Sequence, residues 1–318
     1  MADTLVRALM GGDRKALARA FTKVESRDEG MLDALATLPT RRRSEPGTPH
    51  VIGVTGPPGS GKSTLVDRLV ASGRAAGDLV GVVAVDPSSP FSGGAVLGDR
   101  LRMERHAGDD GVFIRSVANR GHLGGLSPSV GPFVDLYDAS GFGRVLVETV
   151  GVGQSELAIM GVADTVVVVV TPESGDTVQT MKAGLLEVAD VFVVNKSDRP
   201  AADAIAKDLV DMVRFERELD ADPNAWVVPV LRTQATNGTG IDELGQTLEA
   251  HRTWVRGAGR ARWLERRATG RRLLFADLVG ERARRAAIAQ LDADTAFRAK
   301  LEAGDVTPYE ALRRWSGA

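Results

Sequence analysis

The chain has 318 residues, of which 43% are hydrophobic, and its 40 lysines and arginines nearly balance 42 aspartates and glutamates, for a formal net charge of −2. This balance gives no indication of a nucleic-acid partner. The absence of cysteine excludes disulfides, a thiolate nucleophile and cysteine metal ligands, and it is consistent with a reducing cytoplasm. The N-terminus lacks the apolar core of a signal peptide, and the most apolar run, Val166 to Val170, is far too short to span a bilayer. We therefore expect a soluble cytoplasmic protein with no membrane contact.

The first 43 residues are expected to be helical, because leucine, phenylalanine and valine recur there at spacings of three and four. A linker rich in turn-forming residues, Ser44 to Pro49, follows them. The triple arginine Arg41 to Arg43 has two interpretations, a docking patch or a solvated helix end before the linker, and we favour the second.

The stretch from Val51 to Thr64 reads VIGVTGPPGSGKST and contains G-x-x-x-x-G-K-[ST], the pattern of a phosphate-binding loop. Glycine lets the backbone curl so that successive N–H groups point at one anion, and the positive end of the helix expected after the loop faces the phosphates. Lys62 is expected to contact the β- and γ-phosphates, and the Ser63 hydroxyl to bind magnesium. A chance match is disfavoured by the apolar strand before the loop and the helical spacing after it. The predicted nucleotide-binding residues of the loop are Gly56, Pro57, Pro58, Gly59, Ser60, Gly61, Lys62, Ser63 and Thr64.

Short apolar runs alternate with helical spacings through the rest of the first 250 residues. This alternation predicts an α/β fold with a mostly parallel central sheet flanked by helices. We expect the run at 166–170 to be the central strand because it is the most apolar. Polar motifs follow the strands, at the sheet edge where open α/β sheets bind ligands. The expected strands after the loop are 79–85, 112–116, 144–147, 166–170, 191–194 and 226–231.

Asn195-Lys196-Ser197-Asp198 follows one of these strands and matches the pattern N-K-x-D. The Asp198 carboxylate would accept hydrogen bonds from the ring N–H and the exocyclic amine of guanine, whereas adenine presents an acceptor at that edge. The Lys196 stem would lie along the base. These residues predict guanine specificity, with GTP and GDP as ligands. A weaker motif after the next strand, in which a backbone N–H would meet the guanine oxygen, consists of Thr233, Gln234 and Ala235.

Carboxylates after three strands are candidates for the magnesium site. Glu148 ends the strand expected beside the phosphate-binding loop, and in P-loop enzymes an acidic residue there holds Mg2+, usually through water, while the N–H of a glycine such as Gly151 meets the γ-phosphate. Asp86 and Asp99 bracket a glycine-containing loop and would complete the magnesium shell or position the attacking water. The alternatives are a salt bridge for Glu148 and a helix or turn cap for each aspartate.

Two further polar residues have an open role. Gln154 comes three residues after Gly151, but Val152 stands where many GTPases carry the glutamine that orients water. Lys182 lies in a polar segment after the 166–170 strand and would contact the nucleotide or a partner, or be a solvated helix lysine. The four histidines have no metal-ligand spacing, and we interpret them as structural or surface residues.

An arginine-rich stretch from Arg256 to Arg285, with tryptophan and leucine interleaved, is expected to form a helical extension. Nucleic-acid binding is one interpretation, but interspersed acidic residues and an amphipathic spacing favour packing on the domain or on a second subunit. The chain length fits either one long α/β domain with helical additions or two domains. We predict a helical segment and linker at 1–49, a nucleotide-binding domain at 50–255 and a helical extension at 256–318.

The motifs GPPGSGKST, DPSSPFSGGAVLGDRLRM, VETVGVGQSE and NKSD resemble those of the MeaB/ArgK family of P-loop GTPases, which are of the SIMIBI type. The resemblance covers nearly the whole chain. The block from Asp86 to Met103 is the most diagnostic part, because generic GTPases lack it. Within this block the chain has DPSSPFS where other members carry a threonine and a basic residue after DPSS, which leaves open whether it serves another mutase of the same class.

The resemblance implies a homodimeric G-protein chaperone of an adenosylcobalamin-dependent acyl-CoA mutase, most often methylmalonyl-CoA mutase. Such chaperones gate cofactor loading and protect or rescue the mutase, which in turn accelerates their slow GTP hydrolysis. The residues matching Asp86, Asp99 and Glu148 surround the magnesium in that family. The lysine matching Lys182 lies in a third switch segment and takes part in activated hydrolysis, and the C-terminal arm serves dimerisation.

Two other functions share some of these motifs. Nickel-delivery GTPases of the same wider class use Cys and His ligands, which fits poorly with a chain that has no cysteine and four scattered histidines. A kinase or transport ATPase, the activity once attached to ArgK-type proteins, is opposed by the guanine motif from Asn195 to Asp198.

Overall fold

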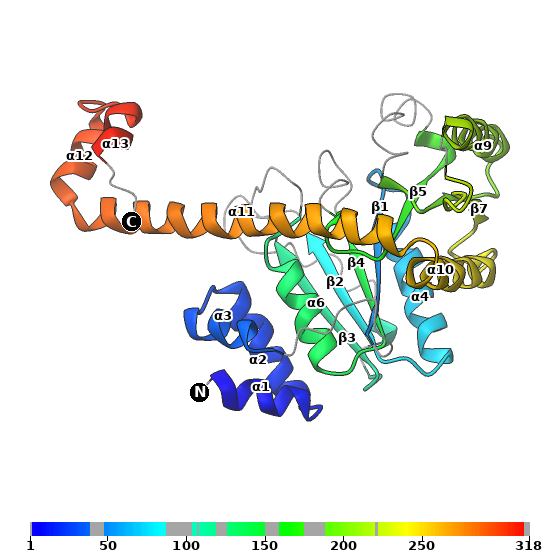
Figure 1. Cartoon of the computed structure of the whole chain (residues 1–318), viewed down its shortest axis with the longest axis horizontal. Helices are drawn as coiled ribbons and strands as arrows, with labels where there is room; N and C mark the ends of the chain where they lie inside the picture. The colour runs from blue at the N-terminus through cyan, green and yellow to red at the C-terminus, as the bar shows by residue number, and fades with distance from the viewer. Residues whose placement is uncertain are drawn as a thin grey trace. The chain divides into compact units, whose positions relative to one another are not determined.

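The computed structural model describes residues 2–38, 48–86, 104–106, 108–118, 126–149, 159–174, 188–219 and 222–314 (Figure 1). It divides into two compact units, residues 1–270 and 271–318. The first unit contains the sheet and the predicted nucleotide-binding motifs. The domain boundaries predicted near residues 50 and 256 remain predictions.

A seven-stranded sheet forms the centre of the first unit, and every pair of neighbouring strands in it is parallel. The order is β3-β2-β4-β1-β5-β6-β7. This agrees with the predicted α/β fold. The strands are β1 (His50–Thr55), β2 (Val80–Asp86), β3 (Val112–Ala118), β4 (Arg144–Glu148), β5 (Thr165–Val170), β6 (Val191–Asn195) and β7 (Val230–Thr233).

Two details of the sheet differ from the prediction. The middle strand is β1, which pairs with β4 and β5, whereas β5 was expected there because it is the most apolar. Both strands are buried along their whole length, so apolarity alone does not distinguish the middle position. The last strand begins at Val230 instead of Trp226, because Pro229 has no N–H to donate to the ladder. Trp226 instead donates its indole N–H to the Asp190 carbonyl at 2.8 Å.

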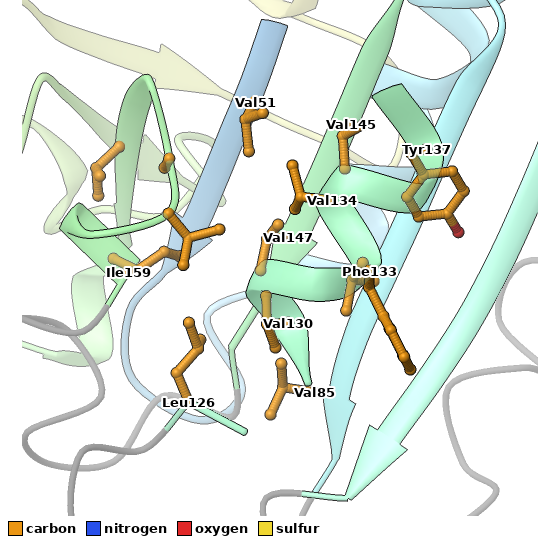
Figure 2. Packing of buried hydrophobic residues seen from close by; sticks show 14 of the residues in the cluster. Val51, Val85, Leu126, Val130, Phe133, Val134, Tyr137, Val145, Val147 and Ile159 are labelled. Atoms are coloured by element: carbon orange, nitrogen blue, oxygen red, sulfur yellow. The ribbon is translucent and has the colours of Figure 1, made fainter. Parts of the chain in front are cut away.

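Helices cover both faces of the sheet. Helices α4 (Lys62–Ala75) and α10 (Ile241–Arg256) pack on one face, and α6 (Val130–Ala139) and α9 (Ala202–Leu219) on the other. Side chains alternate between the two cores along β5, where Val167 faces one and Val168 the other. Figure 2 shows the α6 side, in which Phe133 and Val134 lie among residues of β2 and β4.

Three N-terminal helices share the core of α6. They are α1 (Ala2–Met10), α2 (Arg14–Glu25) and α3 (Glu29–Ala36). Asp13 caps α2 by accepting hydrogen bonds from the N–H groups of Lys15 and Ala16. The buried Phe21 ring of α2 lies 4.5 Å from Phe133 and 4.9 Å from Tyr137, measured between ring centroids. The helices therefore belong to the first unit, and the triple arginine at 41–43 lies outside the described residues.

The C-terminal region is helical, as predicted. Helix α11 (Arg260–Ala293) contains the boundary between the two units, and α12 (Thr295–Ala303) and α13 (Pro308–Arg314) follow. Pro308 is the first residue of α13, where its missing N–H costs nothing. Within the first unit, Trp263 and Arg267 of α11 are buried.

A chain of buried polar groups lies at the sheet edge where the strands begin. Thr165 Oγ1 is 2.8 Å from His50 Nε2 and 2.8 Å from His251 Nδ1. Asp190 extends the chain, 3.4 Å from His251 and 2.9 Å from Arg266 of α11. Both histidines are structural, as expected from the sequence.

We predict that acid destabilises the protein through this chain in two stages. Burial lowers the pKa of His50, although its contact with Glu249 acts in the opposite direction. The unfolded chain takes up this proton near pH 6.5, so the free energy of unfolding should fall as the pH drops below that value. Burial would raise the pKa of Asp190, but Arg266 and His251 lower it well below its usual value, so its contribution is lost only below about pH 4.

Urea unfolding of the whole chain at pH 7.5, 6.5 and 5.5 measures the first stage. The variant His50→Gln keeps a polar group near Thr165 without the titration. Its stability should depend less on pH over this range than that of the unmodified chain, and equal pH dependence would contradict the assignment to His50.

Candidate nucleotide-binding site

The phosphate-binding loop joins β1 to α4 at the edge where the strands end. At two of its glycines, packing leaves no room for a side chain. Gly56 has φ +139° and a Cβ there would collide with the carbonyl of Val169 in β5. Gly61 has φ +88° and a Cβ there would collide with the Asn195 side chain. The loop is thus closely packed against both β5 and the end of β6.

Lys62 is the buried cation of the loop. Its Nζ donates hydrogen bonds to the carbonyl oxygens of Gly56 at 2.9 Å and Pro57 at 3.0 Å. Gly61 is the N-cap of α4 and provides no side chain to bond the first N–H groups of the helix. The loop thus combines a lysine ammonium with a helix start that has no side-chain cap, two features that favour anion binding.

Ser63 donates a hydrogen bond from Oγ to Oε1 of Glu148 at 2.6 Å, and both residues are buried. The strand register places Glu148 opposite Val54 of β1 on one side and Ala84 of β2 on the other. Asp86, the last residue of β2, is also buried at this edge of the sheet. Three of the four predicted magnesium ligands, Ser63, Asp86 and Glu148, thus belong to elements that meet at the end of β4.

Oxygen donors of this kind fit magnesium, which takes few protein ligands and keeps several of its waters. In the described part of the chain, no group of three or more His, Cys, Asp or Glu side chains is placed to hold a metal ion. A magnesium site here would therefore use the Ser63 hydroxyl with Glu148, and Asp86 beside them. The predicted residues Asp99, Gly151 and Lys182, and also Gln154, lie outside the described residues.

Asn195 connects the phosphate-binding loop to the predicted base-binding residues. Its Nδ2 donates to the Ser60 carbonyl at 2.8 Å, and its Oδ1 accepts from the Thr233 hydroxyl and the Ala235 N–H, both at 3.1 Å. The N–H of Gln234 donates to the Thr239 carbonyl at 3.0 Å. The motif predicted to contact the guanine oxygen thus already uses the N–H groups of Gln234 and Ala235 in contacts within the protein.

The end of the N-K-x-D motif is open to solvent. Asp198 is exposed, and the Ser197 N–H donates to the Thr233 carbonyl at 3.1 Å, which fixes the loop against β7. Lys196 has φ +56°, an uncommon backbone conformation for a residue other than glycine. Its ammonium lies 3.9 Å from Glu173, which also contacts Arg199. Sequence analysis missed Glu173, because nothing in its local pattern indicates a contact with a loop that follows another strand.

This arrangement can hold a nucleoside triphosphate. The loop and α4 offer N–H groups and a cation for phosphates, Ser63 and Glu148 offer oxygens for a metal ion, and Asp198 offers a carboxylate for a base. Asn195 holds the two halves of the site together through direct hydrogen bonds.

Comparison with known proteins supports this interpretation. Residues 17–290 match the model of the family "Methylmalonyl Co-A mutase-associated GTPase MeaB". A Pyrococcus horikoshii protein that is provisionally named a GTPase is 46% identical over 260 residues, which cover 81% of this chain and 80% of that protein. The GTPase ArgK of Escherichia coli is 38% identical over 259 residues, 80% of this chain and 77% of ArgK.

A mouse protein named "Methylmalonic aciduria type A homolog, mitochondrial" is 35% identical over 256 residues, 77% of this chain and 62% of that protein. The crystal structure of a protein named "LAO/AO transport system kinase" has a TM-score of 0.70 and 26% identity, and covers 98% of this chain and 95% of that chain. The sequence match and the parallel sheet together show the P-loop GTPase fold.

Proposed function

Because the chain belongs to the MeaB family of methylmalonyl-CoA mutase-associated GTPases, we propose that it binds and hydrolyses GTP and acts as a chaperone of an adenosylcobalamin-dependent acyl-CoA mutase. The observation that carries the nucleotide part is the position of Asn195. Its hydrogen bonds to Ser60 and Ala235 join a phosphate-binding loop to a guanine-reading motif in one site.

The residues of the site have distinct roles in nucleotide binding and GTP hydrolysis. Lys62 exchanges its two loop carbonyls for phosphate oxygens and balances the charge that develops there as water attacks the γ-phosphate in line. Ser63 and Glu148 would hold magnesium, with Asp86 beside them, and the ion would supply positive charge next to the phosphates. Asp198 and the Lys196 stem select guanine. Asn195 holds the base-binding loop at a fixed position relative to the phosphate-binding loop.

Activated hydrolysis needs further groups. The residues matching the family's third carboxylate and switch lysine are Asp99 and Lys182, and we propose that they complete the magnesium shell and assist hydrolysis. Val152 stands where many GTPases carry the glutamine that orients water, so turnover by this chain alone should be slow. A partner mutase that contributes to or positions these groups would accelerate it.

The proposed partner is methylmalonyl-CoA mutase or a close relative, such as a hydroxyisobutyryl-, isobutyryl- or ethylmalonyl-CoA mutase. The name of the matched family and the mouse relative support this class of partner. We further propose that the chain is a homodimer that uses its C-terminal helices, because apolar side chains are exposed in the second unit. They include Leu273, Phe275, Val279 and Ile288.

A search of the described helices finds none with the length and apolarity needed to cross a membrane. We propose a cytoplasmic location, in keeping with the proposed partner enzyme.

Cofactor loading tests the chaperone role. Purified mutase without cofactor is mixed with adenosylcobalamin and the full chain, in the presence of GTP, GDP or a non-hydrolysable GTP analogue. The proposal predicts that the amount of cofactor bound to the mutase depends on which nucleotide is present. Equal loading in all three conditions and without the chain would refute the gating role.

A further inference from the structure

One face of α4 carries more than the magnesium ligand. Ser63, Asp67 and Arg74 lie on this face, since residues four apart on a helix are neighbours and seven more residues complete about two further turns. Neither Asp67 nor Arg74 belongs to the nucleotide-binding motif. Both bind the same short stretch of chain, residues 105–111.

Asp67 makes the contacts that lie closer to Ser63 along α4. Its carboxylate is buried, with 10% of the side chain exposed, and Oδ1 accepts a hydrogen bond from Arg105 Nε at 2.6 Å. Arg105 Nη2 contacts the other carboxylate oxygen, so the guanidinium and the carboxylate form a bidentate ion pair. His106 Nε2 lies 3.0 Å from Oδ1. Both partners belong to the short helix η1 (Glu104–His106).

Arg74 binds the same stretch farther from the phosphates. Its Nε donates to Asp109 Oδ2 at 2.8 Å, and a Cβ at Gly111 would overlap its guanidinium. The two attachments differ in position, because Asp67 is one turn from Ser63 and Arg74 is three turns away. Asp109 therefore offers a matched control for Asp67.

The attached stretch ends the part of the chain that begins at Asp86. Asp99, the proposed third carboxylate of the magnesium site, precedes Glu104 by five residues. Five residues span at most about 17 Å, so only a short piece of chain connects Asp99 to the helix η1 that Asp67 contacts. Asp67 belongs to α4, and the first turn of that helix carries Lys62 and Ser63.

We propose that Asp67 is a positioning residue for GTP hydrolysis. By holding Arg105 on α4, it fixes η1 about one turn of α4 from the magnesium ligand Ser63, at the end of the stretch of sequence that contains Asp99. This inference rests on the proposed GTPase function and extends it to a residue that touches neither the nucleotide nor the metal. Misplacement of a catalytic group by about 1 Å can lower the rate up to about 100-fold without removing the group.

The test compares Asp67→Asn with Asp109→Asn in the full chain. Asp67→Asn keeps the side-chain volume and removes the negative charge that pairs with Arg105. We expect its single-turnover GTP hydrolysis rate to fall about tenfold, and the Mg2+ concentration for half-maximal rate to rise. Its affinity for GDP without Mg2+ should stay within about threefold, because Lys62 and the Asn195 contacts are intact. Asp109→Asn should hydrolyse GTP at close to the unmodified rate.

The variant Arg105→Gln removes the same ion pair by changing its more exposed partner. The double variant Asp67→Asn with Arg105→Gln should hydrolyse GTP no more slowly than the slower of the two single variants. A rate for Asp67→Asn within twofold of the unmodified chain would overturn the inference, as would equal losses in Asp67→Asn and Asp109→Asn. If Asp67→Asn does not fold, a normal rate and normal Mg2+ dependence for Arg105→Gln overturn it. Failure of the proposed function looks different, because the unmodified chain would then hydrolyse no GTP with or without a mutase.

Discussion

Lys62→Ala is expected to lower the rate of GTP hydrolysis about 100- to 1,000-fold, because it removes the buried cation of the phosphate-binding loop. The ammonium lies 2.9 and 3.0 Å from two loop carbonyls, which hold it where the phosphates would bind. Removing it leaves the charge that develops on the γ-phosphate without its nearest protein cation. Single-turnover hydrolysis at saturating GTP measures the loss.

Lys207→Ala, which changes an exposed lysine of α9, is the control for the general effect of removing a lysine. It should leave the rate unchanged. A rate for Lys62→Ala within fivefold of the unmodified chain would show that the loop does not act on the reacting phosphate as described.

Asp198→Asn is expected to reverse the choice of base. The carboxylate accepts from two donors of guanine, whereas the amide of asparagine would place its own donors against them and match the carbonyl of xanthine instead. In the complex, two donors of the base that face donors instead of acceptors cost a few kcal/mol, so the affinity for GDP should fall about 100- to 1,000-fold while that for XDP rises. Displacement of a fluorescent nucleotide by GDP and by XDP measures both changes.

Asp203→Asn, on the exposed start of α9, provides a control outside the motif. It should keep the preference for GDP. An unchanged GDP affinity in Asp198→Asn would refute the role of Asp198 in base recognition.

The sequence was sufficient to predict the fold and to identify the phosphate-binding loop and the N-K-x-D loop as candidate parts of one site. Strands buried on both faces have unbroken apolar runs, so the parallel sheet could be predicted. The P-loop and N-K-x-D motifs each consist of residues close together in the sequence, so both could be recognised from a local pattern. The middle strand could not be identified this way, because β1 and β5 are equally buried.

Contacts between distant parts of the chain were not predictable. Asn195 reaches Ser60 across 135 positions, and Asp67 reaches Arg105 across 38. No local sequence pattern indicates contacts between residues so far apart in the chain. The sequence predicted Asn195 as a ligand contact, whereas its described hydrogen bonds go to the protein itself and hold the two halves of the site together. The roles of Asp99 and Lys182 remain predictions from the resemblance.

The rate of GTP hydrolysis with and without a cobalamin-dependent acyl-CoA mutase tests the central proposal most directly. Val152 in place of the usual glutamine predicts slow turnover by the chain alone. Saturating mutase should raise the turnover rate at least about tenfold, with no effect on any hydrolysis of ATP. The same rate of GTP hydrolysis with and without the mutases of this class would contradict the proposal.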